Sequence, residues 1–237
     1  GRQILEQLEE NLKIAGEDRI PICQDTGMAV IFLKIGQDVH IEGGSLAEAV
    51  NQGVHDGYVE GYLRKSVVAE PLFNRKNTQN NTPAIIYTEI VPGDKVDIQV
   101  ELKGFGSENK SDVAMLVPAD GVEGVKNAVL EIVKHAGPNP CPPIVLGIGI
   151  GGTMDQAAVM SKKALLRDIS VPHKDADYAK LEEEIMEMVN KTGIGPQLGG
   201  TTTCIGVNIE WGATHIAGLP VAVTIMCHAA RHKHVVL

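Results

Sequence analysis

The order of helical and extended patterns along this chain restricts the folds that it can adopt more than any other feature of the sequence. Helical spacing of apolar residues and short apolar runs typical of buried strands follow one another without a low-complexity linker or an internal repeat. The helical patterns cover residues 3–15, 121–136 and 177–191, and the apolar runs cover residues 28–35, 144–150, 205–209 and 221–226. This alternation predicts an α+β (mixed α/β) fold, with mixed sheets flanked by helices. We expect a single compact unit over residues 1–237, and a division into two lobes stays open.

Local cap and turn signals add two further elements. Ser45-Leu46-Ala47-Glu48 has the pattern of a capping box and predicts a helix that runs to about Arg64. The β-type runs at residues 84–90 and 95–102 are joined by Val91-Pro92-Gly93-Asp94, which predicts a hairpin. A glycine-rich polar loop is expected after it, at residues 104–111.

Composition excludes several classes of function. The chain has 237 residues, a net charge of −9 and no basic block, so nucleic acid is not expected as a partner. Only 3% of the residues are aromatic, which argues against a base-stacking surface. No apolar run has the length of a membrane span, and the first residues do not resemble a signal peptide. We therefore expect a cytoplasmic protein without membrane contact.

The chain contains four cysteines and no CxxC pair. A disulfide framework, a thioredoxin-type redox site and a ribbon-type zinc site are therefore not expected. Cys23, Cys141 and Cys227 fall at the ends of predicted elements, beside proline, glycine or polar residues, whereas Cys204 lies within a predicted strand. Composition alone favours four buried, inert thiols, and the alternative is a site assembled from distant segments.

Residues 147–152 match GxGxxG between the predicted strand at 144–150 and a helix expected to run to about Arg167. A dinucleotide site would also need an acidic residue at the end of a second strand about 20 positions later. Asp168 has that spacing, but its segment is short and reaches Pro172, and no βαβ unit precedes the motif. A close backbone approach, with a helix N-terminus facing an anion, is therefore favoured over a nucleotide.

Single titratable residues leave alternatives open. Asp25 could be a general base or a turn former before Thr26-Gly27, and His215 could be a general acid, an orienting group or a structural histidine. His228, His232 and His234 cluster near the C-terminal end, where we expect a solvated tail rather than a metal site.

Five segments together resemble one known family. They are Pro21–Gly27, Lys103–Asn109, Gly147–Thr153, Gly218–Val223 and Cys227–Arg231. These segments look like the α part of the class I, iron–sulfur fumarases and L-tartrate dehydratases, and the resemblance extends over nearly the whole chain.

The resemblance implies a [4Fe-4S] cluster held by three cysteines, with the fourth iron open to substrate. The matching positions are Cys23, Cys141 and Cys227, while Cys204 does not match. Thiolates suit such a cluster, and an iron without a cysteine can accept oxygen ligands and act as a Lewis acid.

The same resemblance implies roles for five neighbours. Gln24 would hydrogen-bond to substrate, Arg64 would bind a carboxylate, and the Gly106 backbone would approach substrate closely. Asp25 would assist the base that removes a carbon-bound proton, and His215 would contact substrate or handle a proton.

Single-chain members of this family carry a further C-terminal β domain, and no segment here resembles it. We therefore expect the α subunit of a two-subunit hydro-lyase, or a fragment of a longer chain, inactive without the β part. The expected substrate is a small dicarboxylate, and the expected assembly is a higher oligomer with two-fold symmetry. Fumarase activity on L-malate and fumarate is favoured over L-tartrate dehydration. The alternatives from other classes are a non-catalytic metal-binding module and a nucleotide-binding oxidoreductase.

Overall fold

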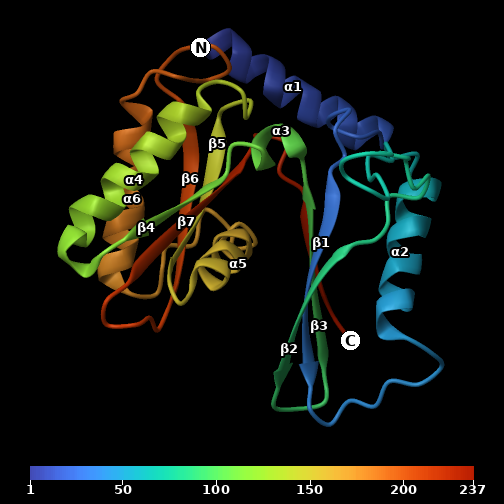
Figure 1. Ribbon diagram of the computed structural model, residues 1–237. Helices are drawn as coiled ribbons and strands as arrows, with labels where there is room; N and C mark the ends of the chain where they lie inside the picture. Colours follow the sequence, from blue (N-terminus) through green and yellow to red (C-terminus); the bar gives the residue numbers. More distant parts are fainter. The chain divides into compact units, whose positions relative to one another are not determined.

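The computed structural model describes all 237 residues, which divide into two compact units (Figure 1). The first unit comprises Gly1–Ile14 and Gly106–Ala229, and the second comprises Ala15–Phe105 and Ala230–Leu237. Each unit contains one four-stranded sheet. The predicted α+β class, with mixed sheets flanked by helices, is confirmed.

The helices are α1 (Arg2–Asp18), α2 (Leu46–Glu60), α3 (Phe105–Glu108), α4 (Gly121–Ala136), α5 (Met154–Ala164) and α6 (Ala176–Asn190). The strands are β1 (Met28–Gly36), β2 (Ile85–Val91), β3 (Val96–Lys103), β4 (Asp112–Leu116), β5 (Ile144–Gly151), β6 (Cys204–Gly212), β7 (Leu219–Met226) and β8 (His232–Val236). None of the helices combines the length and the apolar character that crossing a membrane would require.

In the second unit the strand order is β2-β1-β3-β8, and α2 lies along one side of this sheet (Figure 1). Alternate residues of β1, such as Ile31 and Leu33, pack against Val54 and Tyr58 of α2. Ser45 caps α2 as predicted, since its hydroxyl accepts a hydrogen bond from the Glu48 N–H. The helix ends at Glu60 rather than near Arg64, because Tyr62, directly after the C-cap Gly61, takes a left-handed backbone conformation with φ +53°.

The predicted hairpin is wrong, because β1 lies between β2 and β3, parallel to the former and antiparallel to the latter. Nearly every residue of β1 is buried, whereas β2 is mostly exposed, so β1 takes the central place and β2 the edge. The turn after β2 crosses the end of β1, where Gly36 N–H donates to Lys95 O at 2.8 Å. The turn was recognisable from sequence, but the strand inserted between its two arms was not.

The expected solvated tail is also a strand. β8 pairs with β3, which places His234 opposite Gln99, and His234 Nε2 lies 3.1 Å from Asp97 Oδ2. All five β8 residues are exposed, so their sequence carries no burial pattern that could reveal the strand. The expected polar loop at residues 104–111 contains the short helix α3.

In the first unit the strand order is β4-β7-β5-β6, with β5 parallel to β6 and antiparallel to β7. Figure 1 shows α4 and α6 on one side of this sheet and α5 on the other. Apolar residues of α4 and α6, such as Val129 and Ile185, pack against Leu146 and Ile148 of β5. This layer is the main core of the chain.

The glycine motif at residues 147–152 brings α5 close to the sheet. A Cβ at Gly147 would lie 2.0 Å from Ser161 O, and one at Gly149 would lie 2.0 Å from Ala157 O. The N-terminus of α5 is capped by its own side chains, since Thr153 N–H donates to Gln156 Oε1 and the Thr153 hydroxyl donates to Asp155. The Thr153 hydroxyl holds the pKa of Asp155 below its usual value, so a carboxylate already occupies this terminus. The motif therefore serves helix–sheet packing.

We predict that Gly149→Ala lowers the free energy of unfolding by about 3 kcal/mol, because the new methyl group would overlap backbone that cannot move aside. Urea denaturation of the variant measures this loss. Gly16→Ala is the control, because a Cβ there meets nothing within 4 Å and lies in α1. That change should leave stability equal or raise it by about 0.5–1 kcal/mol. Equal effects of the two changes would contradict the packing argument.

Candidate functional site

The loop before β1 carries three of the predicted site residues. Gln24 is exposed, while Cys23 and Asp25 are half-buried. The Asp25 carboxylate accepts hydrogen bonds from Gly27 N–H at 3.0 Å and from Phe105 N–H at 2.9 Å. Gly27 has φ +75°, and a Cβ there would lie 2.6 Å from the Lys103 backbone. Asp25 is therefore a turn former in this structure, and its carboxylate fixes the loop against the end of β3.

Three further side chains hold the carbonyl groups of this loop. The Tyr58 hydroxyl donates to Thr26 O at 2.7 Å and to Gly27 O at 2.9 Å. Asn81 Nδ2 donates to Gly27 O at 3.0 Å, and Arg231 Nη2 donates to Asp25 O at 2.7 Å. Burial raises the pKa of Tyr58 to about 12, the Asp25 charge adds to the rise, and Arg231 opposes it. The hydroxyl therefore stays protonated, and able to donate, at neutral pH.

Sequence reasoning did not single out Tyr58, Asn81 or Arg231 as parts of this loop's environment. Tyr58 reads as an ordinary core residue of a helix, and Asn81 lies in a polar stretch without a motif. Their contacts join segments 31 and 54 residues apart, so no local spacing could have found them.

Arg64 lies beside the same loop. The Thr26 hydroxyl donates to Arg64 O at 2.8 Å, which joins the segment after α2 to the loop before β1. The Arg64 side chain is exposed and forms no ion pair within the chain. The second unit thus brings together Cys23, Gln24, Asp25 and Arg64.

The first unit brings together two more cysteines. β5 and β7 are antiparallel with Val145 opposite Met226, so the turn before β5 and the residues after β7 lie at the same end of the sheet. Cys141 lies in that turn and Cys227 directly follows β7. His228 Nδ1 lies 3.0 Å from Cys141 O, which confirms that the two segments meet. Gly106 lies nearby, since a Cβ on it would be 3.9 Å from Asn139 O.

His215 stands apart from this pair of cysteines. It precedes β7, whereas Cys227 follows it, so the length of the strand, about 25 Å, separates them. The His215 ring is exposed, and Nδ1 accepts a hydrogen bond from Ala217 N–H at 3.2 Å. The neutral ring therefore carries its proton on Nε2, which is free to donate.

The fourth cysteine differs from the other three. Cys204 is 2% exposed, and its thiol donates to Gly206 O at 3.2 Å. Burial raises the pKa of this thiol to about 12. Cys23 and Cys227 are half-buried, Cys141 is exposed, and none of the four forms a disulfide. Cys204 is thus an inert core thiol, as its predicted place within a strand indicated.

The donor set of these three thiols suits a soft metal centre. Cys141 and Cys227 belong to the first unit, and Cys23 belongs to the second. No three His, Cys, Asp or Glu side chains of the structure lie close enough together to hold one metal ion. The first unit by itself therefore supplies a pair of thiols rather than a closed metal site.

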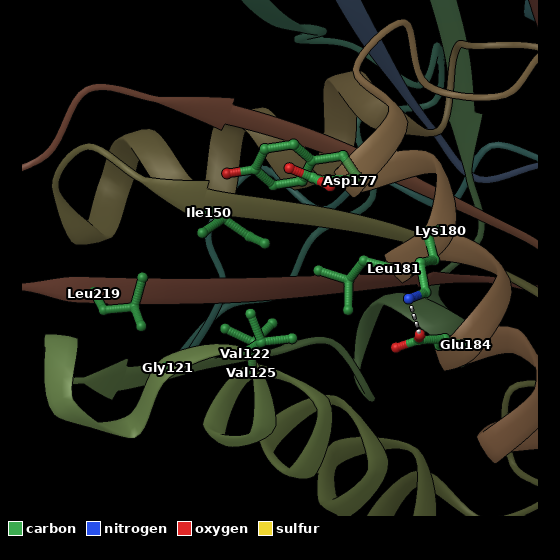
Figure 2. Close-up of a pocket in the computed structure, with 10 residues that line it drawn as sticks. Gly121, Val122, Val125, Ile150, Asp177, Lys180, Leu181, Glu184 and Leu219 are labelled. Carbon is green, nitrogen blue, oxygen red and sulfur yellow. Dashed lines mark ion pairs between the residues drawn. The ribbon is translucent and has the colours of Figure 1, made fainter.

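The first unit also contains a cavity of about 540 Å³. Figure 2 shows it lined by Val122 and Val125 of α4, Leu181 of α6 and Leu219 of β7. On its rim, Glu184 forms ion pairs with Lys180 at 3.6 Å and with Lys126, which lies outside the lining, at 2.6 Å. None of the predicted site residues lines this cavity, so it is not the candidate site.

Comparison with known proteins gives consistent matches over nearly the whole chain. Residues 1–236 match a family model described as "Fumarate hydratase (Fumerase)". A Methanocaldococcus jannaschii protein, named provisionally as an L(+)-tartrate dehydratase subunit alpha, is 44% identical over 239 residues, 97% of this chain and 82% of the relative. The L(+)-tartrate dehydratase subunit alpha of Escherichia coli (strain K12) is 35% identical over 236 residues, 98% of this chain and 77% of the relative.

We predict that iodoacetamide at about pH 8 modifies the metal-free, folded chain at Cys141, Cys23 and Cys227 but not at Cys204. A thiol whose pKa is about 12 has roughly one thiolate in ten thousand molecules at that pH, and this one is also buried. Peptide mass spectrometry measures the labelling. Denaturing the chain is the control, because it should make Cys204 react like the others. Labelling of Cys204 in the folded chain would contradict the assignment.

Proposed function

The chain belongs to the fumarate hydratase family, and from this membership we propose that it is the α subunit of a [4Fe-4S]-dependent hydro-lyase. The proposed reaction interconverts an L-2-hydroxydicarboxylate and its dehydrated product, with water as the other product. The observation that carries the proposal is the family match over residues 1–236, which includes every predicted site residue.

Two substrates are candidates. L-Malate, which loses water to give fumarate, corresponds to the reaction in the family model's description. L(+)-Tartrate is the second candidate, because the relatives from M. jannaschii and E. coli carry the name of tartrate dehydratase. Both are four-carbon dicarboxylates with a hydroxyl beside a carboxylate, and tartrate has one hydroxyl more.

Cys23, Cys141 and Cys227 would hold the cluster, and Cys204 would not. Two findings support this set: Cys141 and Cys227 lie at one end of the first unit's sheet, and the buried Cys204 thiol stays protonated. When bound, the cluster would supply a Lewis-acidic iron for the carboxylate and the leaving hydroxyl of substrate.

The chain's own residues would bind and orient the dicarboxylate. The exposed Arg64 guanidinium has no partner charge in the chain and suits a bidentate carboxylate contact. Gln24 offers an exposed amide on the neighbouring loop. Gly106 leaves its backbone open to close approach from outside. The Asp25 carboxylate, held by two N–H groups, would assist the base mainly by fixing this loop.

His215 requires a different arrangement. The length of β7 separates it from Cys227, so we propose that it contacts substrate or handles a proton in the site of a neighbouring copy. A higher oligomer with two-fold symmetry would supply such a neighbour, and we include that assembly in the proposal.

The remaining part of the site would come from a β subunit. The relatives are named "subunit alpha", which supports a two-subunit enzyme. Three cysteines that must stay reduced to bind a cluster need a reducing compartment, so the proposed location is the cytoplasm.

We predict that anaerobic reconstitution loads the chain with about four irons and as many sulfides. Cys23→Ser, Cys141→Ser and Cys227→Ser should each lose most of this iron and sulfide, because a serine hydroxyl is a poor ligand for a soft cluster iron. Cys204→Ser is the matched control and should keep both. Iron and acid-labile sulfide assays measure the content. A requirement for Cys204, or full loading without Cys141, would overturn the ligand set.

We predict that the chain and its β subunit together dehydrate an L-2-hydroxydicarboxylate, while either subunit alone is more than about a thousandfold slower. Absorbance of the unsaturated product from L-malate, and a coupled assay for the product from L(+)-tartrate, measure the two activities. Faster turnover of L-malate than of L(+)-tartrate would support fumarase, and turnover of L(+)-tartrate without turnover of L-malate would support tartrate dehydratase. An assembled, iron-loaded complex that converts neither would refute the proposed function.

A further inference from the structure

One buried amide joins the two segments that carry the substrate-binding residues of the second unit. The Asn81 side chain is fully buried, with 0% exposed. Its Oδ1 accepts hydrogen bonds from Ser66 N–H at 2.6 Å and Val67 N–H at 3.2 Å. Its Nδ2 donates to Gly27 O at 3.0 Å. Both ends of the amide are therefore occupied by backbone groups of different segments.

These partners stand next to the predicted binding residues. Ser66 follows Arg64 by two positions, and Gly27 closes the loop that holds Gln24 and Asp25. The Thr26–Arg64 hydrogen bond at 2.8 Å joins the same two segments a second time. The Asn81 bonds to Val67 and Gly27 are buried, and the bonds of Ser66 and Thr26 are partly buried. Because water competes little for such bonds, they are stronger than exposed ones, and they set the separation between the Arg64 segment and the Gln24 loop.

We propose that Asn81 is a positioning residue, which fixes the spacing between Arg64 and the Gln24–Asp25 loop and thereby the affinity for the dicarboxylate. The inference rests on the proposed function, in which both segments bind the same substrate. A short dicarboxylate is bound well only when the groups that contact it are held at a matching separation, and a displacement of about 1 Å costs up to a hundredfold in rate. Asn81 touches no substrate and acts through the two segments.

Asn81→Asp tests separately the two hydrogen-bonding groups of this side chain, the acceptor Oδ1 and the donor Nδ2. A carboxylate keeps the oxygen that accepts from Ser66 and Val67, but it replaces the Nδ2 donor with an oxygen facing Gly27 O. The change therefore removes the link to the Gln24–Asp25 loop and leaves the link to the Arg64 segment. Asn81 also has φ +61°, which glycine adopts easily, so Asn81→Gly removes both links without backbone strain.

Asn190 provides a matched control in the first unit. Its Oδ1 accepts from two consecutive N–H groups, Thr203 at 2.8 Å and Cys204 at 2.9 Å, and its Nδ2 donates to Cys204 O at 3.0 Å. Asn190→Asp therefore makes the same chemical change in the same hydrogen-bond pattern, but in the first unit, whereas the Gln24 loop and the Arg64 segment belong to the second.

The test compares Asn81→Asp, Asn81→Gly and Asn190→Asp in the assembled, iron-loaded enzyme. With the dicarboxylate that the wild type converts, we expect KM to rise at least about tenfold in both Asn81 variants, with kcat changed less. The variants are compared at equal iron content, and KM of Asn190→Asp should stay within about twofold of the wild type. A KM equal to that of Asn190→Asp in a folded Asn81 variant would overturn the proposal.

Hydrogen exchange separates failure of this inference from failure of the proposed function. In Asn81→Asp and Asn81→Gly, we expect amides of residues 23–27 to exchange at least about tenfold faster, which Asn190→Asp should not show. If the amide exchange rates of residues 23–27 are the same in both Asn81 variants as in the wild type, the positioning role is overturned. An assembled enzyme that converts neither dicarboxylate would refute the function, and the exchange result would still decide whether Asn81 holds the loop. If Asn81→Asp does not fold, both KM and the hydrogen exchange of residues 23–27 are measured on Asn81→Gly.

Discussion

Buried donors that converge on the carbonyls of Asp25, Thr26 and Gly27 determine the arrangement of the second unit's site. A loop can pass through a protein interior only if its polar backbone groups find partners there, since an unpaired carbonyl costs about 1–3 kcal/mol. Tyr58 from α2, Asn81 from the segment before β2, and Arg231 from the segment before β8 provide these partners. The loop therefore has one conformation only when these three segments are in place, and Cys23, Gln24 and Arg64 take their positions from it.

In the first unit, sheet topology brings two of the predicted site residues together. An antiparallel pairing puts the start of β5 and the end of β7 side by side, so Cys141 and Cys227, 86 residues apart in the sequence, need no motif to meet. The close contact of α5 with Gly147 and Gly149 keeps β5 buried on both faces, which holds that end of the sheet rigid. The same pairing carries His215 to the opposite end. The antiparallel pairing of β5 with β7 thus explains both why Cys141 and Cys227 meet and why His215 lies far from them.

Sequence patterns predict the features that depend on neighbouring residues. The cap at Ser45, the buried strand at Ile144–Gly151 and the acidic helix at Ala176–Asn190 all rest on local spacing, and the structure confirms them. The inserted β1, the exposed β8 and the contacts of Asn81 depend on pairing between distant segments, which local spacing does not encode. The distinction between Cys204 and the other cysteines was visible because burial within a strand is itself a local property. The role of Asn81 was not visible, because its three partners lie 14, 15 and 54 residues away.

The choice between malate and tartrate depends on how a site treats one hydroxyl. Arg64 and Gln24 would contact the carboxylates and the hydroxyl that both substrates share, so these residues favour neither. A pocket without a partner for the additional hydroxyl rejects tartrate only weakly, by about a hundredfold, because the hydroxyl can keep a water molecule. A site built to bind that hydroxyl leaves a buried polar group unpaired when malate enters, and it rejects malate by about ten thousandfold or more. The discrimination is therefore asymmetric: a tartrate enzyme should exclude malate strictly, whereas a malate enzyme should retain a measurable rate on tartrate.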